Sequence, residues 1–500
     1  MSASKQKKIR KQQRDEGTDK RTTARLEEER KAKRSKIITA VITTIVVVLA
    51  AAVILINSNL FYKNFSAVTV GDESYTAAEL SYFYNTAYYS YTSQYGQMLT
   101  YMGLDTSRPL DSQQYGEDQT WADFFKDIAI DNMQSVTMLW KEAQKEGFTL
   151  TGEQREELES QLSELDTVHQ TAGFPSANKY LAAVYGKGVT KALVAELTER
   201  SYIAEMYSQY KNDSFTYTDA ELESKYEENK DNYDTYSFMS VFVSGAADED
   251  AGIDAETAMA EAKDKLDELV ESDIENEEDF SANAEEIAGV AATPQNISGS
   301  TVLADYAEWM KDKSREEGDM TVVETSNGYT AVYFISRSDN DYNTKNVRHI
   351  LVKAVADENG EYTAEAKKAA REKAEELLAL WKEGDATEDT FAEMAGINSE
   401  DTGSTSNGGL YENVSRGRMV EEFNDWIFDE ARKPGDTGIV FNEDSSYCGY
   451  HVMYFVGDGG NYRQLQAEST LRSDDYDAWN TETLEKYPVS RGFTAGFVGR

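Results

Sequence analysis

The sequence predicts an α+β protein with one N-terminal transmembrane helix, a mostly helical region and two tandem domains in which helices cover antiparallel sheets. Three observations predict this fold class. An uncharged run of 20 residues lies near the N-terminus, helix-start signals recur along residues 57–232, and one strand-and-helix pattern occurs twice between residues 233 and 458. Five hundred residues are also too many for a single hydrophobic core, so several domains are expected.

Residues 1–36 form a basic tail. They contain 14 Lys or Arg and 6 Asp or Glu and so carry a formal charge of +8, whereas the whole chain carries −41. Residues 37–56 are uncharged and long enough for a helix to cross the hydrocarbon core of a bilayer. Because basic residues crowd the N-terminal side of this run, we expect a single-pass signal anchor in the cell membrane, with the tail cytoplasmic and the body extracytoplasmic.

A cleaved signal peptide is the alternative, with the alanines at 50–52 as its small-residue cleavage site. The apolar run continues through residues 53–56, and the charged stretch before it is much longer than usual, so the sequence favours the anchor. The acidic body argues against nucleic-acid binding, because phosphate contacts need clustered Lys and Arg. The only cysteine, Cys448, excludes an intramolecular disulfide.

Residues 57–232 are predicted to be mostly helical after a strand-like stretch at 67–76. Capping boxes, in which a threonine oxygen and an acid or amide satisfy free backbone N–H groups at a helix start, lie at Thr76, Thr151 and Thr218. Residues 121–147 place apolar side chains with a period of 3.6 and end at a glycine, which indicates a helix. Tyrosines crowd the first helix. They suit either an adaptable surface for unfolded chains or packing between helices.

Residues 233–340 and 341–458 carry one pattern twice. In both copies a strand, a helix, a Phe and Ala four apart, a Trp-containing helix and a final strand follow in the same order. Corresponding residues are Phe280 and Phe391, Trp309 and Trp426, Arg315 and Arg432, and Gly318 and Gly435. We therefore expect two domains in which helices cover an antiparallel sheet. In the remaining segment, 459–500, a helix at 474–487 and a terminal strand at 493–498 are predicted.

The two copies differ at two histidines. His349 and His451 lie in strand-like runs of the second copy, and the first copy has Ser240 and Thr330 at the matching positions. Two neutral imidazoles can donate and accept hydrogen bonds in series and so fix each other's tautomers. The alternative is that both histidines only organise the sheet. The first copy is expected to have kept the fold without the site.

The second copy resembles a parvulin-type peptidyl-prolyl isomerase. The motifs that carry the resemblance are NVRHILVK (346–353), FAEMAG (391–396), SEDTGSTSNGGL (399–410), RGRMVEEF (416–423) and CGYHVMYF (448–455). The resemblance implies that His349 and His451 lie beneath the bound proline, that Asp401 lies close to the reacting amide, and that Ser446 extends the hydrogen-bonded chain. It also implies a proline-ring pocket of Leu410, Met419 and Phe423. One departure is an extra residue in GGLYENVSRG relative to the family spacing.

Each of these roles has a plainer alternative. Asp401 in a Ser/Gly loop is also a common turn residue, and Met419 and Phe423, four apart, are also a common helical core pair. An aspartate beside histidines in an apolar pocket has a perturbed pKa, and its charge would oppose double-bond character in the C–N bond. The paired arginines of phosphate-directed parvulins are absent from residues 354–362, so unphosphorylated substrates are expected.

Residues 57–232 resemble the N-terminal chaperone module of SurA- and PrsA-type foldases, which implies that the C-terminal segment returns to complete that module. The expected protein is a foldase that isomerises Xaa-Pro bonds in exported clients and has chaperone activity, with unfolded or newly exported polypeptides as partners and no metal or cofactor. The alternative is an anchored holdase chaperone without isomerase activity. The sequence leaves the clients, the oligomeric state and the type of envelope open.

Overall fold

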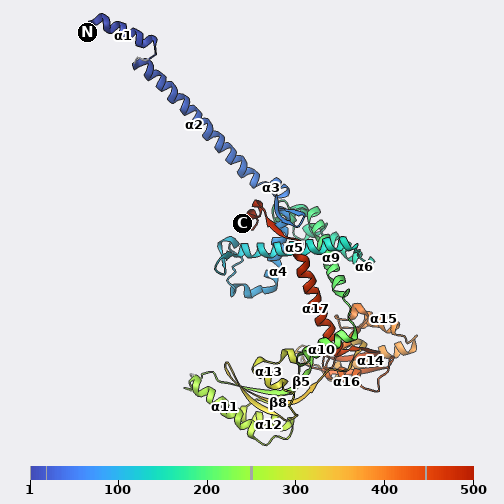
Figure 1. Ribbon diagram of the computed structural model, residues 1–500. Coiled ribbons are helices and arrows are strands. Elements are labelled where there is room, and N and C mark those ends of the chain that lie inside the picture. The colour runs from blue at the N-terminus through green and yellow to red at the C-terminus, as the bar shows by residue number, and fades with distance from the viewer. Residues whose placement is uncertain (1, 18–19, 248–251, 445–446, 500) are drawn as a thin grey trace. The chain divides into compact units, whose positions relative to one another are not determined.

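The computed structural model describes residues 2–17, 20–247, 252–444 and 447–499 (Figure 1). The chain divides into two compact units, Met1–Ser214 with Asp475–Arg500, and Phe215–Asp474. Helices and antiparallel sheets occur together, which is the predicted α+β class. The limits predicted for the individual domains remain predictions.

The N-terminal part of the first unit consists of α1 (Ala3–Asp15), α2 (Lys20–Ile56) and α3 (Asn59–Asn64). Among the described residues, α2 is the one helix long and apolar enough to cross a membrane, with a mean hydropathy of 2.9 in its most apolar window and no buried residue there. The hydroxyls of Thr43 and Thr44 donate to carbonyls one turn earlier, at Thr39 and Ala40. Their polar atoms are thereby satisfied inside the apolar helix.

The helical module of the first unit begins with a β-hairpin. Its elements are β1 (Ser66–Val70), β2 (Glu73–Thr76), α4 (Ala77–Tyr95), η1 (Gly96–Thr100), η2 (Leu110–Ser112), β3 (Gln114–Tyr115), β4 (Gln119–Thr120), α5 (Trp121–Glu146), α6 (Gly152–Glu164), α7 (Val168–Thr171), α8 (Ala177–Tyr185) and α9 (Lys191–Asp213). The capping boxes predicted at Thr76, Thr151 and Thr218 are all present. A further one at Thr120, with Asp123 as the acid, starts α5.

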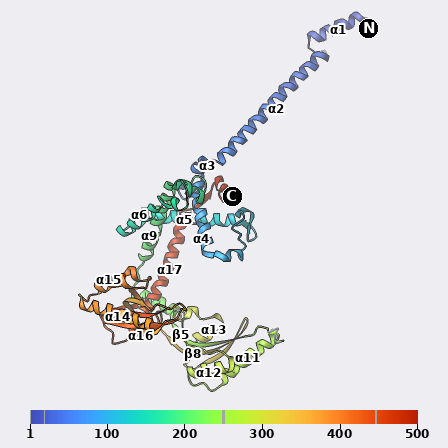
Figure 2. The same cartoon turned by 180° about the vertical axis from the view of Figure 1, so that it is seen from behind.

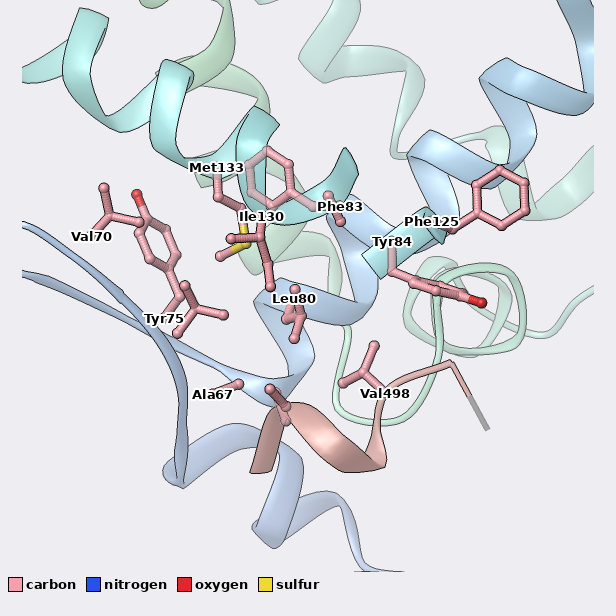
Figure 3. Close-up of a cluster of buried hydrophobic side chains, with 14 of the residues drawn as sticks. Ala67, Val70, Tyr75, Leu80, Phe83, Tyr84, Phe125, Ile130, Met133 and Val498 are labelled. Atoms are coloured by element: carbon pink, nitrogen blue, oxygen red, sulfur yellow. The ribbon is translucent and has the colours of Figure 1, made fainter. Parts of the chain in front are cut away.

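The core of this module lies between the hairpin and the helices α4 and α5. Figure 3 shows Tyr75 and Leu80 facing Ile130 and Met133 of α5, with Val498 of the C-terminal segment close by. Most tyrosines of α4 pack against this core; Tyr89 is the most exposed of them, at 44%. Packing between helices therefore accounts for most of the tyrosines that the sequence left open.

The C-terminal segment returns to the hairpin, as the resemblance implied. Strand β13 (Val489–Arg491) pairs antiparallel with β1, with Val70 opposite Val489. The strand predicted at 493–498 is wrong, because Phe493–Phe497 forms the 3-10 turn η5, which turns Thr494 and Ala495 inward. The preceding helix α17 (Tyr462–Leu484) begins 12 residues earlier than predicted.

The second unit begins with α10 (Asp219–Tyr233) and then contains the repeated pattern. Residues 233–340, the first copy, form β5 (Thr235–Ser244), α11 (Ala255–Glu271), α12 (Glu277–Ala288), β6 (Gln295–Ser298), η3 (Gly299–Thr301), α13 (Ala304–Lys311), β7 (Met320–Thr325) and β8 (Gly328–Ser338). Residues 341–458, the second copy, contain β9 (Asn343–Lys353), α14 (Ala364–Glu383), α15 (Glu388–Asn398), η4 (Thr405–Asn407), β10 (Leu410–Val414), α16 (Glu421–Phe428), β11 (Thr437–Glu443) and most of β12 (Cys448–Asn461). Their sheets have the orders β6-β5-β8-β7 and β10-β9-β12-β11.

The residues that correspond in the sequence repeat make the same contacts in both copies. The Arg315 guanidinium lies 4.7 Å from the centre of the Trp309 ring, and that of Arg432 lies 4.0 Å from the Trp426 ring. Gly318 donates its backbone N–H to Phe334 at 2.9 Å, and Gly435 donates to Phe455 at 2.8 Å. Both glycines have positive φ, of 88° and 91°. The two copies thus share the glycine turn and the contact between arginine and tryptophan, as well as the sequence pattern.

Strand register places Ser240 and Thr330 where the second copy has its histidines. In the second copy His349 lies opposite Met453, and Leu351 lies opposite His451. In the first copy Ser240 lies opposite Val332, and Phe242 lies opposite Thr330. The spacing between the two positions is the same in both sheets.

The sheet of the second copy has two differently covered faces. Alternation along β9 turns Ile350 and Val352 towards α14, in a cluster with Trp381 and Phe391. The opposite face, with Val347 and Met453, packs against α16 through Phe423 and Ile427. The site lies on this second face.

Candidate active site

The side chains predicted from the sequence come from four separate elements. His349 lies on β9, His451 on β12 and Asp401 in the loop after α15. Phe423 lies in the first turn of α16, and Met419 lies in the bend before that helix, so the two are not a pair on one helix face. They line one cavity of about 310 Å³, whose other lining residues are Leu351, Lys353, Tyr411, Arg418, Val420 and Tyr447.

Two consecutive glycines let the loop before β10 approach β9. Gly409 has φ of +72°, and a Cβ atom there would lie 2.2 Å from the carbonyl oxygen of His349. Gly408 has φ of +60°, and its Cβ would lie 2.7 Å from that of Ala392. No other residue fits either position without displacement. The backbone N–H of His349 donates to Gly409 at 2.9 Å, which fixes the histidine beside the loop that carries Asp401.

A chain of hydrogen bonds crosses the floor of the cavity. Nε2 of His349 lies 2.8 Å from Oδ2 of Asp401, and Nδ1 of His349 lies 3.0 Å from Nδ1 of His451. At the far end, the Tyr447 hydroxyl lies 2.9 Å from Nε2 of His451. Both histidines are buried, so each ring nitrogen requires a partner, and each has one.

With one proton on each ring, a single arrangement satisfies every bond. The Asp401 carboxylate can only accept, so His349 donates from Nε2 and accepts at Nδ1. His451 then donates from Nδ1 and accepts at Nε2 from the Tyr447 hydroxyl. All donors in the chain therefore point from Tyr447 towards Asp401, which fixes both tautomers.

The Asp401 carboxylate is held by three side-chain donors. Besides His349, the Ser404 hydroxyl donates to Oδ2 at 2.5 Å and the Tyr411 hydroxyl at 2.9 Å. The hydrogen bond from His349, followed by those from Ser404 and Tyr411, holds the pKa of Asp401 well below its usual range despite partial burial. The carboxylate is therefore charged at neutral pH.

His451 is held neutral. Burial, reinforced by the neighbouring His349, lowers its pKa to about 3, although Asp401 acts in the opposite direction. Burial also raises the pKa of Tyr447 to about 12, so its hydroxyl keeps its proton. The chain thus contains an ionised Asp401, a neutral His451 and a protonated Tyr447 hydroxyl.

An apolar wall faces the chain. The Phe423 ring lies edge-on to both imidazoles, with centroids 5.5 Å from His349 and 5.3 Å from His451. Met419 and Val420 extend this wall just before α16, and Leu351 contributes from β9. The cavity therefore combines an apolar surface with one fixed carboxylate.

The comparisons with known proteins identify the family of this segment. Residues 332–456 match the family described as the PPIC-type PPIASE domain. The chain carries a parvulin-type peptidyl-prolyl isomerase domain. No curated protein matches the sequence at a significant level.

Several solved structures resemble the chain weakly. PrsA from Bacillus anthracis, described as a peptidylprolyl isomerase, is 15% identical over 56% of this chain and 94% of its own, with a TM-score of 0.19. PrsA from Bacillus subtilis is 18% identical over 60% of this chain and 87% of its own, with a TM-score of 0.18. A Campylobacter jejuni structure, from a pair described as SurA-like chaperones, is 14% identical over 55% of this chain and 83% of its own, with a TM-score of 0.16.

The parvulin-type site differs from the sequence expectation at one described residue, Leu410. Leu410 is not among the residues that line the cavity; Tyr411 lines it, because neighbouring residues of a strand face opposite sides. Ser446, expected to extend the hydrogen-bonded chain, lies outside the described residues, and the hydroxyl bonded to His451 belongs to Tyr447. Sequence reasoning also missed Ser404. Its spacing of three from Asp401 was the available signal, since short Asp-x-x-Ser loops often close on themselves.

The extra residue in the GGLYENVSRG loop is absorbed by a β-bulge. Between Tyr411 and Val414 strand β10 advances three residues while its partner β9 advances two, and Asn413 adopts a positive φ of 50°. Asn413 also accepts from Thr344 at 3.1 Å and from the backbone of Gly460 at 2.9 Å. The Asp401–Tyr411 bond lies before the bulge and is not displaced by it.

Proposed function

We propose that this protein is a membrane-anchored, extracytoplasmic foldase in which the cavity of the second copy isomerises Xaa-Pro bonds of exported clients. The observation that carries the proposal is the fixed Asp401 carboxylate at one side of an apolar cavity, beside the family match of the same segment. The established chemistry of the domain is rotation about a bond with a barrier of about 18–20 kcal/mol.

The apolar wall lowers this barrier by desolvation. The planar amide is the more polar form, so transfer out of water destabilises it relative to the twisted form. Met419 and Phe423 would bind the proline ring, so that the residue before the proline rotates about the C–N bond. This assigns to them the substrate-binding role that the sequence predicted.

The carboxylate acts on the electrons of the amide. Planarity requires delocalisation that places negative charge on the carbonyl oxygen, and a nearby anion opposes this charge. Asp401 would thereby favour the twisted amide with its C–N single bond. His349, His451 and Tyr447 act as positioning residues that hold the carboxylate ionised and oriented, and no proton needs to move.

The first copy would contribute structure without catalysis. Ser240 and Thr330 stand at the histidine positions of its sheet, and Thr330 is buried. A hydroxyl pair there cannot supply the chain of imidazoles that holds a carboxylate. We assign isomerisation to the second copy alone.

The helical module would hold unfolded clients outside the cell, with α2 as the span and the basic tail inside. The length and apolar character of α2 and the +8 charge of residues 1–36 support this topology. The holdase without isomerase activity is the less favoured alternative, because residues 332–456 match an isomerase family.

The test is cis/trans exchange of an unphosphorylated Xaa-Pro peptide, measured by NMR with the full chain in detergent micelles. The proposal expects exchange far faster than the uncatalysed tens to hundreds of seconds. An unchanged exchange rate together with retained suppression of client aggregation would favour the holdase instead.

A further inference from the structure

A cluster of apolar side chains, three of them exposed, lies around α3, directly after α2. We name it the aromatic foot and define it as Leu60, Phe61, Phe65, Phe493 and Phe497. Leu60 is 66% exposed, Phe65 45% and Phe493 80%. Apolar side chains this exposed and this close together mark a contact surface more often than chance exposure does.

The rings of the foot form a continuous series. Ring centroids are 5.3 Å apart for Phe61 and Phe65, 5.2 Å for Phe61 and Phe497, and 5.2 Å for Phe493 and Phe497. The Tyr62 hydroxyl also donates to the carbonyl of Phe497 at 3.2 Å. Figures 1 and 2 both show the C-terminal segment beside α3. The chain thus brings residues more than 400 positions apart into one apolar cluster, in which Phe61 is buried and Leu60, Phe65 and Phe493 are exposed.

The foot begins four residues after the end of the predicted span. Four residues span at most about 14 Å, and hydrogen bonds hold the connection between α2 and α3. Asn57 donates its side-chain N–H to Val53 at 3.0 Å, and Ser58 donates its hydroxyl to Leu55 at 2.6 Å. Ser58 also caps α3. The end of α2 therefore leads into α3 without a flexible linker.

The charge around the foot differs from that of the rest of the body. Residues 57–71 contain no Asp or Glu, although the chain as a whole is strongly acidic. Lys187 lies 3.2 Å from Oδ1 of Asn57 and 5.8 Å from the centre of the Tyr62 ring, and Lys63 lies in the last turn of α3. Lysines together with aromatic side chains are typical of protein surfaces that lie in the headgroup region of a bilayer.

We propose that the aromatic foot lies in the headgroup region of the membrane that α2 enters, so that the body is seated on the bilayer surface. This inference rests on the topology of the proposed function. The partner is a lipid surface, favoured over a protein partner because the foot lies within a few residues of the span. Lys63 and Lys187 would add a preference for anionic lipids.

The test uses the full chain reconstituted in vesicles and labelled at one engineered cysteine. Cys448 is fully buried, so it does not compete for the label. Phe493→Cys carries an environment-sensitive fluorophore, and Tyr101→Cys, 93% exposed and outside the foot, is the matched control. Vesicles contain lipids with a spin label near the headgroup, which quench only fluorophores in contact with the bilayer.

Strong quenching at 493 with little at 101 is the expected result. Quenching at position 493 should weaken in the double variant Lys63→Gln/Lys187→Gln when the vesicles contain anionic lipid. The same variant should change it little when the lipids are zwitterionic. Equal quenching at both positions, or protection of position 493 by an unfolded client peptide and not by lipid, would overturn the inference. Recovery of a protein cleaved at about position 53 would also overturn the inference, because α2 would then not span the membrane. The isomerase assay does not depend on this and would still test the proposed activity.

Discussion

The charge of Asp401 is the most specific element of the proposed mechanism, and two substitutions separate it from the hydrogen bonds of the same side chain. Asp401→Ala removes the acceptor used by His349, Ser404 and Tyr411. Asp401→Asn keeps one acceptor oxygen at nearly the same place and removes the charge.

The structure sets different stability costs for the two variants. In Asp401→Ala, the buried donors of His349 and Ser404 lose their acceptor, and one unpaired buried donor costs about 1–3 kcal/mol. Oγ of Ser404 lies 3.3 Å from Nε2 of His349, so these two groups can bond each other and limit the loss to about one unpaired donor. Asp401→Asn should lose less stability than Asp401→Ala.

The value of kcat/KM should depend on the negative charge of Asp401. If the anion opposes amide resonance, both variants lose at least about tenfold in kcat/KM, which corresponds to about 1.4 kcal/mol of transition-state stabilisation. The assay is peptide isomerisation at saturating and subsaturating substrate, with thermal unfolding of each variant as the folding control. Wild-type kcat/KM in Asp401→Asn would refute the electrostatic role and leave Asp401 as a turn residue.

The remaining predictions concern the pocket, pH and topology. Met419→Ala should lower kcat/KM by tenfold or more. The control is Ile397→Ala, on α15 outside the cavity and 83% exposed, which should leave kcat/KM unchanged. Equal losses in the two variants would show that Met419 does not bind the proline ring. Because the pKa of His451 is about 3 in the folded state and about 6.5 in an unfolded chain, its contribution to stability is present above about pH 6.5 and is lost as the pH falls towards 3. The protection factors of β12 amides against hydrogen exchange should therefore fall on acidification less in His451→Asn than in wild type, and identical profiles would contradict the buried neutral state. Protease added to intact protoplasts should remove the body and spare an N-terminal tag, whereas a soluble body lacking residues before about position 53 would support a cleaved signal peptide.

Local signals in the sequence predicted the helices well, because helix starts depend on residues three apart. Thr76, Thr151 and Thr218 cap helices as expected, and the helix from Trp121 ends at Gly147 in the left-handed conformation. The C-terminal strand was misplaced because its existence depends on pairing with β1, more than 400 residues away, and the alternating FTAGFV pattern alone could not reveal the partner.

Site residues that belong to a sequence motif could be predicted. Those that reach the site through long-range packing could not. His349, His451, Asp401, Met419 and Phe423 line one cavity, as the motifs suggested. Tyr447 and Tyr411 were missed because a hydroxyl at the tip of a long ring lies far from its backbone, so long-range packing decides which tyrosine reaches the site. The bulge at Asn413 could not be located from an extra residue alone.

The central claim is that the cavity of the second copy alone carries isomerase activity. The most direct measurement is the peptide exchange rate of the full chain in which Asp401→Ala and Met419→Ala are combined, with aggregation of an unfolded client followed in the same preparation. The account predicts exchange at the uncatalysed rate with client protection retained. Substantial catalysed exchange in the folded double variant would contradict it, because the activity would then reside elsewhere in the chain.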